Sequence, residues 1–162
     1  MKKIKILLLA LGIITCTAIT VSCNDDDDNY TPGSSIVEIF DDYYPDATDV
    51  EWYYIGGYYV ADFNYYGEDM EAWFSYDGKW LYTKTEIAYP ALPVEVQANL
   101  MTNYIDYDIE DIIEITTSKY GTFYNIEIEN DNEELSLLYD ESGTLIKIYA
   151  NVMPYSWWDS LN

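Results

Sequence analysis

A short segment centred on an Asp-Gly dipeptide places the strongest constraint on the fold: EAWFSYDGKWLY, residues 71–82. Apolar and polar residues alternate on both sides of Asp77-Gly78, which is typical of two antiparallel strands joined by a two-residue type I′ turn. Such a turn predicts the cross-strand pairs, which are Ser75 with Trp80, Phe74 with Leu81, Trp73 with Tyr82, and Glu71 with Lys84. The opposite charges of the last pair support this register.

Adding a third strand, joined through a turn at Tyr66-Gly67, divides the side chains between two faces. The first face is predicted to be the core and carries Tyr59, Ala61, Phe63, Met70, Ala72, Phe74, Leu81 and Thr83. The second face carries what we call the aromatic ridge: Tyr58, Val60, Trp73, Trp80 and Tyr82, rimmed by Asp62, Glu71 and Lys84. Because Trp and Tyr dominate binding hot spots, the ridge and its rim are interpreted as a partner-binding site. The alternative is that the ridge packs against the C-terminal tail, residues 153–158, or against the other half of the chain.

Similar segments follow one another in the same order in the two halves of the chain. YVADFN, residues 59–64, resembles YNIEIE, residues 124–129, and AWFSYD, residues 72–77, resembles LSLLYD, residues 135–140. Leu81-Tyr82-Thr83 resembles Ile146-Lys147-Ile148. These similarities predict a duplication. They also predict that Ile126, Ile128, Leu135, Leu137, Ile146 and Ile148 form the core face of the second half.

A helical pattern precedes each set of strands. Ser35 is a candidate cap for a helix with the apolar face Ile36, Ile39, Phe40 and Tyr43, ended by Pro45. Pro93 suits the first turn of a second helix that faces inward through Val96, Leu100 and Tyr104. Residues 49–54 and 111–115 read as the first strands of the two halves. The predicted fold class is therefore α+β, a tandem duplication of a helix plus a four-stranded antiparallel sheet, with the two sheets side by side.

The N-terminus reads as an export signal of the lipoprotein type. A basic start, MKKIK, precedes the apolar run 6–14, and Thr20-Val21-Ser22-Cys23 is similar to a lipobox, in which Cys23 receives the lipid. Cys16 is a competing site, and an ordinary secretory signal is the alternative. The predicted boundaries are a signal peptide at 1–22, an acidic tether at 23–33, repeats at 34–90 and 91–152, and a tail at 153–162.

The four aspartates Asp25 to Asp28 repel one another and predict a solvated tether. They lack the spaced ligands and the glycine of an EF-hand calcium loop. Their position resembles the acidic surface-export signal of some Gram-negative bacteria. We therefore expect an outer-membrane lipoprotein of the cell envelope, displayed on the surface, with the periplasmic face as the alternative.

Charge and missing residue types narrow the function. The signal takes three of the seven lysines, which leaves four lysines against thirty acids, a formal charge of −26. Such a charge repels nucleic acid and anionic headgroups, so the membrane is expected to be met only through the lipid. The chain has no histidine, and both cysteines belong to the signal and the lipid site. These absences disfavour histidine-dependent catalysis and zinc sites, and no cofactor or metal is expected.

Several segments together resemble the PepSY-like family of beta-lactamase-inhibitor-like lipoproteins. They are YYPDATDVEW, YYVADF, EAWFSYDGKWLYTKTEI and LPVEVQANL, and the resemblance covers roughly residues 34–152. It implies tandem units whose sheets make a curved surface, on which relatives grip the enzymes that they inhibit. Fold transfers better than function in such a comparison.

We therefore predict a non-catalytic envelope lipoprotein that binds a macromolecular partner, an enzyme or protease among the candidates, through the aromatic ridge. A surface carbohydrate-binding protein is the alternative, because stacked Trp and Tyr flanked by acids also suit sugar rings. A more distant alternative is a glycosidase that uses two carboxylates.

Overall fold

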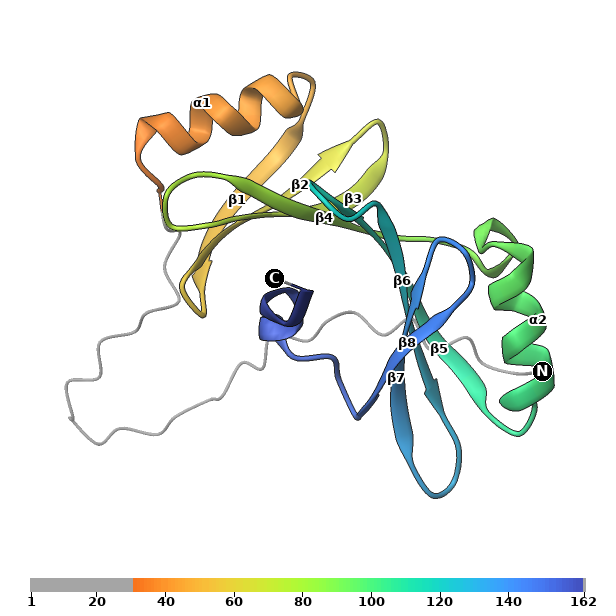
Figure 1. Ribbon diagram of the computed structural model, residues 1–162. Helices are drawn as coiled ribbons and strands as arrows, with labels where there is room; N and C mark the ends of the chain where they lie inside the picture. Colours follow the sequence, from red (N-terminus) through yellow and green to blue (C-terminus); the bar gives the residue numbers. More distant parts are fainter. Residues whose placement is uncertain (1–30, 162) are drawn as a thin grey trace, which may run out of the picture.

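A computed structural model describes residues 31–161. The chain forms one antiparallel sheet of eight strands in sequence order, β1 to β8, with two short α-helices and two 3₁₀ segments (Figure 1). The strands are β1 Thr48–Ile55, β2 Tyr58–Tyr65, β3 Glu68–Phe74, β4 Trp80–Glu86, β5 Asp108–Thr117, β6 Thr122–Glu129, β7 Glu134–Asp140 and β8 Leu145–Ala150. The helical segments are α1 Ser34–Tyr43, η1 Tyr89–Ala91, α2 Val94–Asn103 and η2 Tyr155–Leu161.

The predicted fold class, α+β with a tandem duplication of a helix plus a four-stranded sheet, is wrong. The strands belong to a single, mostly β structure, because β4 pairs directly with β5, from Tyr82 opposite Thr117 to Glu86 opposite Ile113. An edge strand leaves backbone N–H and C=O groups unpaired, and this pairing satisfies them for both strands. Only two short helices accompany the eight strands.

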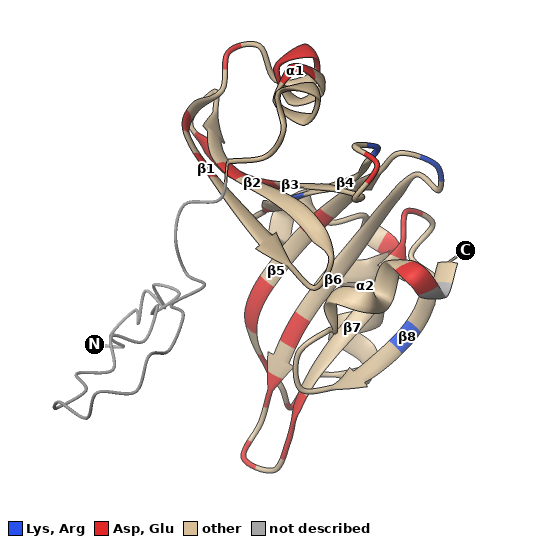
Figure 2. Ribbon diagram, turned by 90° about the vertical axis from the view of Figure 1, so that its left-hand side faces the viewer, with Lys and Arg blue, Asp and Glu red and all other residues tan. Residues whose placement is uncertain are grey.

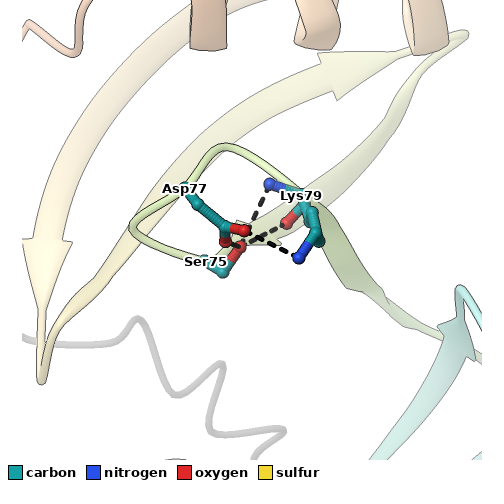
Figure 3. Close-up of polar contacts among 3 residues, drawn as sticks. All are labelled: Ser75, Asp77 and Lys79. Atoms are coloured by element: carbon teal, nitrogen blue, oxygen red, sulfur yellow. Dashed lines mark hydrogen bonds and ion pairs between the residues drawn. The ribbon is translucent and has the colours of Figure 1, made fainter.

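The hairpin of β3 and β4 has a three-residue loop rather than the predicted two-residue turn. The Ser75 N–H donates to the Lys79 carbonyl over 2.9 Å, and the Gly78 N–H donates to the Ser75 carbonyl over 2.9 Å. Gly78 takes the positive φ of 81° that this loop requires. Figure 3 shows the loop held by Asp77, which accepts a hydrogen bond from the Ser75 Oγ at 2.6 Å and lies 2.7 Å from the Lys79 Nζ.

The longer loop changes the start of the register and leaves the rest as predicted. Phe74 lies opposite Trp80 instead of Leu81, and a bulge then restores the pairing. Beyond it, the structure confirms the predicted pairs, Trp73 with Tyr82, Ala72 with Thr83, and Glu71 with Lys84. The bulge places one extra residue in β4, and an extra residue moves the neighbouring side chains relative to the sheet faces. Trp80 is therefore next to Phe74, on the helix-covered face.

Both helices lie on the outer face of the curved sheet (Figure 1). Helix α1 packs Ile36 and Phe40 on the predicted first face, where Tyr59, Ala61, Phe63, Ala72 and Phe74 are confirmed as core. The prediction is wrong for Leu81, the extra residue of the β4 bulge, which packs with the cluster on the inner face. Its N-cap is Gly33 rather than Ser35, without a side-chain cap. Helix α2, with Pro93 as N-cap, packs Val96 and Leu100 on Ile126, Ile128 and Leu137. Ile146 and Ile148 are about half exposed on the last strand, so these two are not core residues.

Candidate protein interface

The inner face of the sheet, opposite α1 and α2, carries an apolar cluster that includes most of the aromatic ridge. Val60, Trp73 and Tyr82 lie at its centre, and Trp73 and Tyr82 are each only 1% exposed. The cluster also includes Ile115, Phe123, Leu138, Met153, Trp157 and Trp158. It therefore draws on β2 to β7 and on η2, which lies in the hollow of the sheet in Figure 1.

The C-terminal segment covers the ridge. Trp157 and Trp158 lie with ring centroids 5.3 and 5.6 Å from that of Tyr82, and Tyr155 stacks on Trp73 at 5.5 Å. The central ridge residues, which the sequence suggested as a partner-binding site, are therefore covered in the free protein. The structure has instead the alternative arrangement, in which the ridge packs against the C-terminal tail. Burying the indoles of Trp157 and Trp158 on the ridge removes apolar area from water, which is the physical reason for this arrangement.

Two ridge residues lie away from the centre of the cluster. The Trp80 indole is on the helix side, where its Nε1 donates to the Thr83 Oγ1 over 2.9 Å and its ring lies 5.0 Å from that of Tyr43. Tyr58 remains half-buried at the margin of the cluster, and its hydroxyl donates to the Asp159 carboxylate over 3.0 Å. Of the predicted ridge, Tyr58, Val60, Trp73 and Tyr82 thus lie together, and Trp80 does not lie with them.

The predicted charged rim lies beside this cluster. The Lys84 Nζ is 3.3 Å from the Glu71 Oε2 and 4.9 Å above the Trp73 ring. The Trp73 Nε1 donates to the same carboxylate oxygen over 3.1 Å. Asp62 lies opposite Glu71 on the neighbouring strand and is exposed. The rim is therefore linked to the ridge through Glu71, which touches both the lysine and the indole.

Pairs of carboxylates also lie opposite one another elsewhere on this face of the sheet. Glu51 lies opposite Asp62 beside the rim, and Asp111 lies opposite Glu127 further along the strands, since the β5 residue paired with Lys84 itself is Ile115. Partial loss of solvation, followed by the neighbouring acids, raises the pKa of Asp62 and of Glu127 above the usual range. Like charges directly opposite one another are destabilising, so this arrangement weakens the fold and concentrates negative potential on the inner face. Figure 2 shows acidic bands on successive strands and few basic ones.

The exposed part of the inner face includes an open depression of about 440 Å³ beside η2. Its lining residues are Gly56, Tyr58, Val152, Met153, Pro154, Tyr155, Ser156 and Asp159. Tyr155 lines this depression, is 56% exposed and stacks on Trp73. Within residues 31–161, no group of three or more acidic, histidine or cysteine side chains is arranged to hold a metal ion.

The role of Phe123 and Ile115 in this face was not predicted from the sequence. Phe123 contacts Trp157 at 5.9 Å, and Ile115 is fully buried opposite Lys84. The sequence contains a signal for both residues, because apolar side chains recur at the strand period at Ile113 and Ile115, and an apolar segment begins again at Phe123. Finding them required the β4–β5 pairing, which places the two halves of the inner face next to each other.

The curved sheet, with its helices outside and an aromatic, acidic face inside, defines a BLIP-like architecture. The chain belongs to the PepSY-like family: a family model described as "Putative beta-lactamase-inhibitor-like, PepSY-like" matches residues 57–147, more than half of the chain. A comparison with curated proteins gives no significant match.

Solved structures from Bacteroides share the fold. A BLIP-like protein of Bacteroides fragilis is 29% identical, with a TM-score of 0.70 over 82% of this chain and 98% of the other. A DUF2874 family protein of Bacteroides ovatus is 26% identical, with a TM-score of 0.70 over 75% and 89%. A Bacteroides eggerthii structure described among "putative periplasmic proteins" is 22% identical, with a TM-score of 0.68 over 75% and 89%.

The predictions for the N-terminus concern residues outside the described part of the chain, namely the signal at 1–22, the lipid site Cys23 and the aspartates 25–28. In residues 31–161, no helix is long and apolar enough to cross a membrane.

Proposed function

We propose that this protein is a non-catalytic lipoprotein of the cell envelope that binds and inhibits another protein through the inner face of its sheet. The observation that carries the proposal is the group of carboxylates Glu51, Asp62 and Glu71 beside Lys84. This group lies next to an aromatic cluster, on the face opposite α1 and α2 of a fold with BLIP-like relatives. A family described by resemblance to beta-lactamase inhibitors supports an inhibitory role.

The proposed contact surface is the part of the inner face that η2 leaves open. Tyr155 and Tyr58 supply aromatic area at its centre, and Glu51, Asp62 and Glu71 supply negative charge beside it. A surface with several carboxylates and one lysine complements a basic partner and accelerates its association. The buried Trp73 and Tyr82 support this surface from beneath, and their predicted direct contact with a partner stays untested.

Binding can be tested with two charge variants of the intact protein. In the first, Asp62→Asn and Glu71→Gln remove two charges from the inner face. In the control, Glu38→Gln and Asp41→Asn remove two charges from exposed positions of helix α1, on the outer face. The variants and the wild type are assayed for inhibition of a panel of beta-lactamases and envelope proteases, and for capture of basic envelope proteins.

We expect the wild type and the α1 control to inhibit or capture a partner. The affinity for that partner should be weaker in the inner-face variant, and weaker for all proteins at raised salt. Equal activity of both variants would place the contact elsewhere. Failure of the wild type to inhibit or capture any member of the panel would contradict the inhibitor function.

The alternative function, carbohydrate binding, is favoured by one observation. The exposed Tyr155 lines an open depression that also contains Asp159 and Tyr58, a combination suited to stacking and hydrogen bonding with a sugar. A glycan array separates the two functions, because binding of a neutral glycan should be insensitive to salt and lost in Tyr155→Ala.

The envelope location is part of the proposal. It rests on the lipobox-like sequence before Cys23, and the description of the Bacteroides eggerthii relative agrees with it. Display on the outer surface, through the aspartates at 25–28, is the finer expectation.

A further inference from the structure

The two edge strands of the sheet differ in how they are protected from pairing with another strand. The first edge strand, β1, carries Asp49 and Glu51 and a register shift between Thr48 and Glu51, and Asp49 has a positive φ of 55°. Charges and bulges of this kind are the usual devices that keep an edge from accepting a further strand. These features protect the first half of β1, whereas residues 52–55 pair regularly with β2.

The other edge strand, β8, has one charged side chain, Lys147, and one bulge, at its start. Its sequence is LIKIYA, without an acid or a proline, and in the described part of the chain it pairs with β7 alone. Ile146 and Ile148 are 46% and 48% exposed. The bulge at its start involves Ile146, whereas residues 147–150 pair regularly with β7. An exposed, regular and apolar edge is a template for an added strand.

Charge indicates which strand would be added. The chain has thirty acids, and without Asp25 to Asp28 twenty-six of them lie in residues 31–161, together with four lysines. Two copies therefore repel each other over most of their surfaces. Residues 142–158 contain no acid, and this is the longest acid-free run in the described part. Strand β8 lies inside this run, so two copies can approach there without opposing carboxylates.

We propose that β8 pairs with β8 of a second copy of this chain, antiparallel and about a two-fold axis, so that two sheets become continuous. In antiparallel strands, side chains directly opposite one another share a face, so the two-fold axis has to pass through a residue that lies opposite its own copy.

An axis at Lys147 would place the two lysines opposite each other, which like-charge repulsion disfavours. An axis at Ile146 would fall on the bulge, where β8 is irregular. An axis at Ile148 places each Lys147 opposite Tyr149 of the other copy, and this is the register that we infer.

Lys147 already lies above the ring of Tyr149 within one chain, with its Nζ 4.9 Å from the ring centroid. In the inferred register the same cation–π contact becomes available between the copies. Because the paired strands are short, we expect a concentration-dependent equilibrium rather than an obligate dimer. Screening by salt should strengthen the dimer, since the distant acids repel and the contact itself has no ion pair.

The test is sedimentation equilibrium of the intact protein at low and high salt, with two matched variants. Ile148→Lys places a charge on the β8 edge, and Val50→Lys places the same charge on β1, where Val50 is 37% exposed. We expect a dimer that is favoured by salt in the wild type and in Val50→Lys, and a monomer in Ile148→Lys. Circular dichroism and the thermal midpoint should show that both variants are folded.

A cross-linking experiment tests the register. In a chain whose Cys16 and Cys23 are replaced by Ser, Ile148→Cys should form an intermolecular disulfide on oxidation, because residues opposite one another across the axis are within bonding distance. Ile146→Cys should cross-link much less. A wild type that is monomeric at every concentration and salt, a dimer broken by Val50→Lys, or open-ended assembly would each overturn the proposal.

Discussion

Trp73 and Tyr82 stack on neighbouring strands, with ring centroids 5.5 Å apart and an interplanar angle of 19°. The register of the β3–β4 hairpin places them opposite each other, and the C-terminal residues Trp157 and Trp158 bury them. The pair is therefore part of a second core on the inner face of the sheet. This changes what substitutions on the two faces of the hairpin should do.

Trp73→Ala and Phe74→Ala should destabilise the protein to a similar extent, although the two side chains point to opposite faces. Both are essentially inaccessible, and truncation of a buried Trp or Phe costs about 3–5 kcal/mol. Urea denaturation of the two variants measures this. A loss for Trp73→Ala much smaller than for Phe74→Ala would show that the inner cluster is loosely packed.

Trp157→Ala should loosen the C-terminal segment and expose the ridge. The Trp157 indole is buried between Tyr82 and Phe123, so its removal should cost about 3–5 kcal/mol and increase binding of a hydrophobic dye. Tyr155→Ala, in the same segment but 56% exposed, is the matched control and should change stability by about 1 kcal/mol or less. Equal effects of the two would mean that η2 is not anchored by Trp157.

Gly143→Ala should be more harmful than Gly67→Ala. Both glycines have positive φ, 82° and 93°, for which an alanine costs about 1–2 kcal/mol. A Cβ at Gly143 would also lie 2.4 Å from the Cβ of Glu95, whereas at Gly67 it would meet open space. The clash adds about 1–3 kcal/mol, because the turn after β7 packs directly on α2. Thermal unfolding of the two variants should show this order; the opposite order would exclude the contact with α2.

Glu127→Gln should stabilise the protein at neutral pH. Burial, with the negative charges of Asp111 and Glu134, raises the pKa of Glu127 in the folded state. The folded state therefore binds the Glu127 proton more tightly than the unfolded state does. The resulting stabilisation is fully present below the unfolded pKa of about 4.3 and is lost as pH rises through the folded pKa. The advantage of Gln should thus be seen at pH 7 and disappear in acid.

The control for this charge change is Glu129→Gln, an exposed acid on the same strand. Thermal midpoints of both variants across the acid range supply the comparison. A gain in Glu127→Gln that persists at low pH, or an equal gain in Glu129→Gln, would argue against a role for burial at position 127.

Cys23→Ser should release the protein from the membrane fraction and block signal cleavage. Thiol-linked lipid is the only membrane anchor expected for the exported chain, and Cys16→Ser should leave fractionation unchanged. Fractionation of cells that express each variant is the measurement. An unchanged distribution in Cys23→Ser would favour an ordinary secretory signal.

Local features of the fold followed from the sequence alone. Alternation of apolar residues around Asp77-Gly78 was sufficient to predict most of the hairpin register, including the Glu71–Lys84 pair, because side chains in a strand alternate with a fixed period. The three-residue loop was missed, since one Asp-Gly dipeptide suits turns of two lengths, and the choice depends on whether Asp77 also adopts positive φ. The resulting bulge moved Trp80 to the other face.

The candidate interface depended much more on tertiary structure. The sequence determined that the hairpin has two apolar faces, and that one of them is covered by α1, because helical and strand periodicities are local. It could not determine what covers the second face. That was decided by the pairing of β4 with β5, which joins the strands into one sheet, and by the return of Trp157 and Trp158 onto Tyr82. Contacts between residues so distant in the chain are selected by shape and buried area in the folded molecule, which no local pattern encodes.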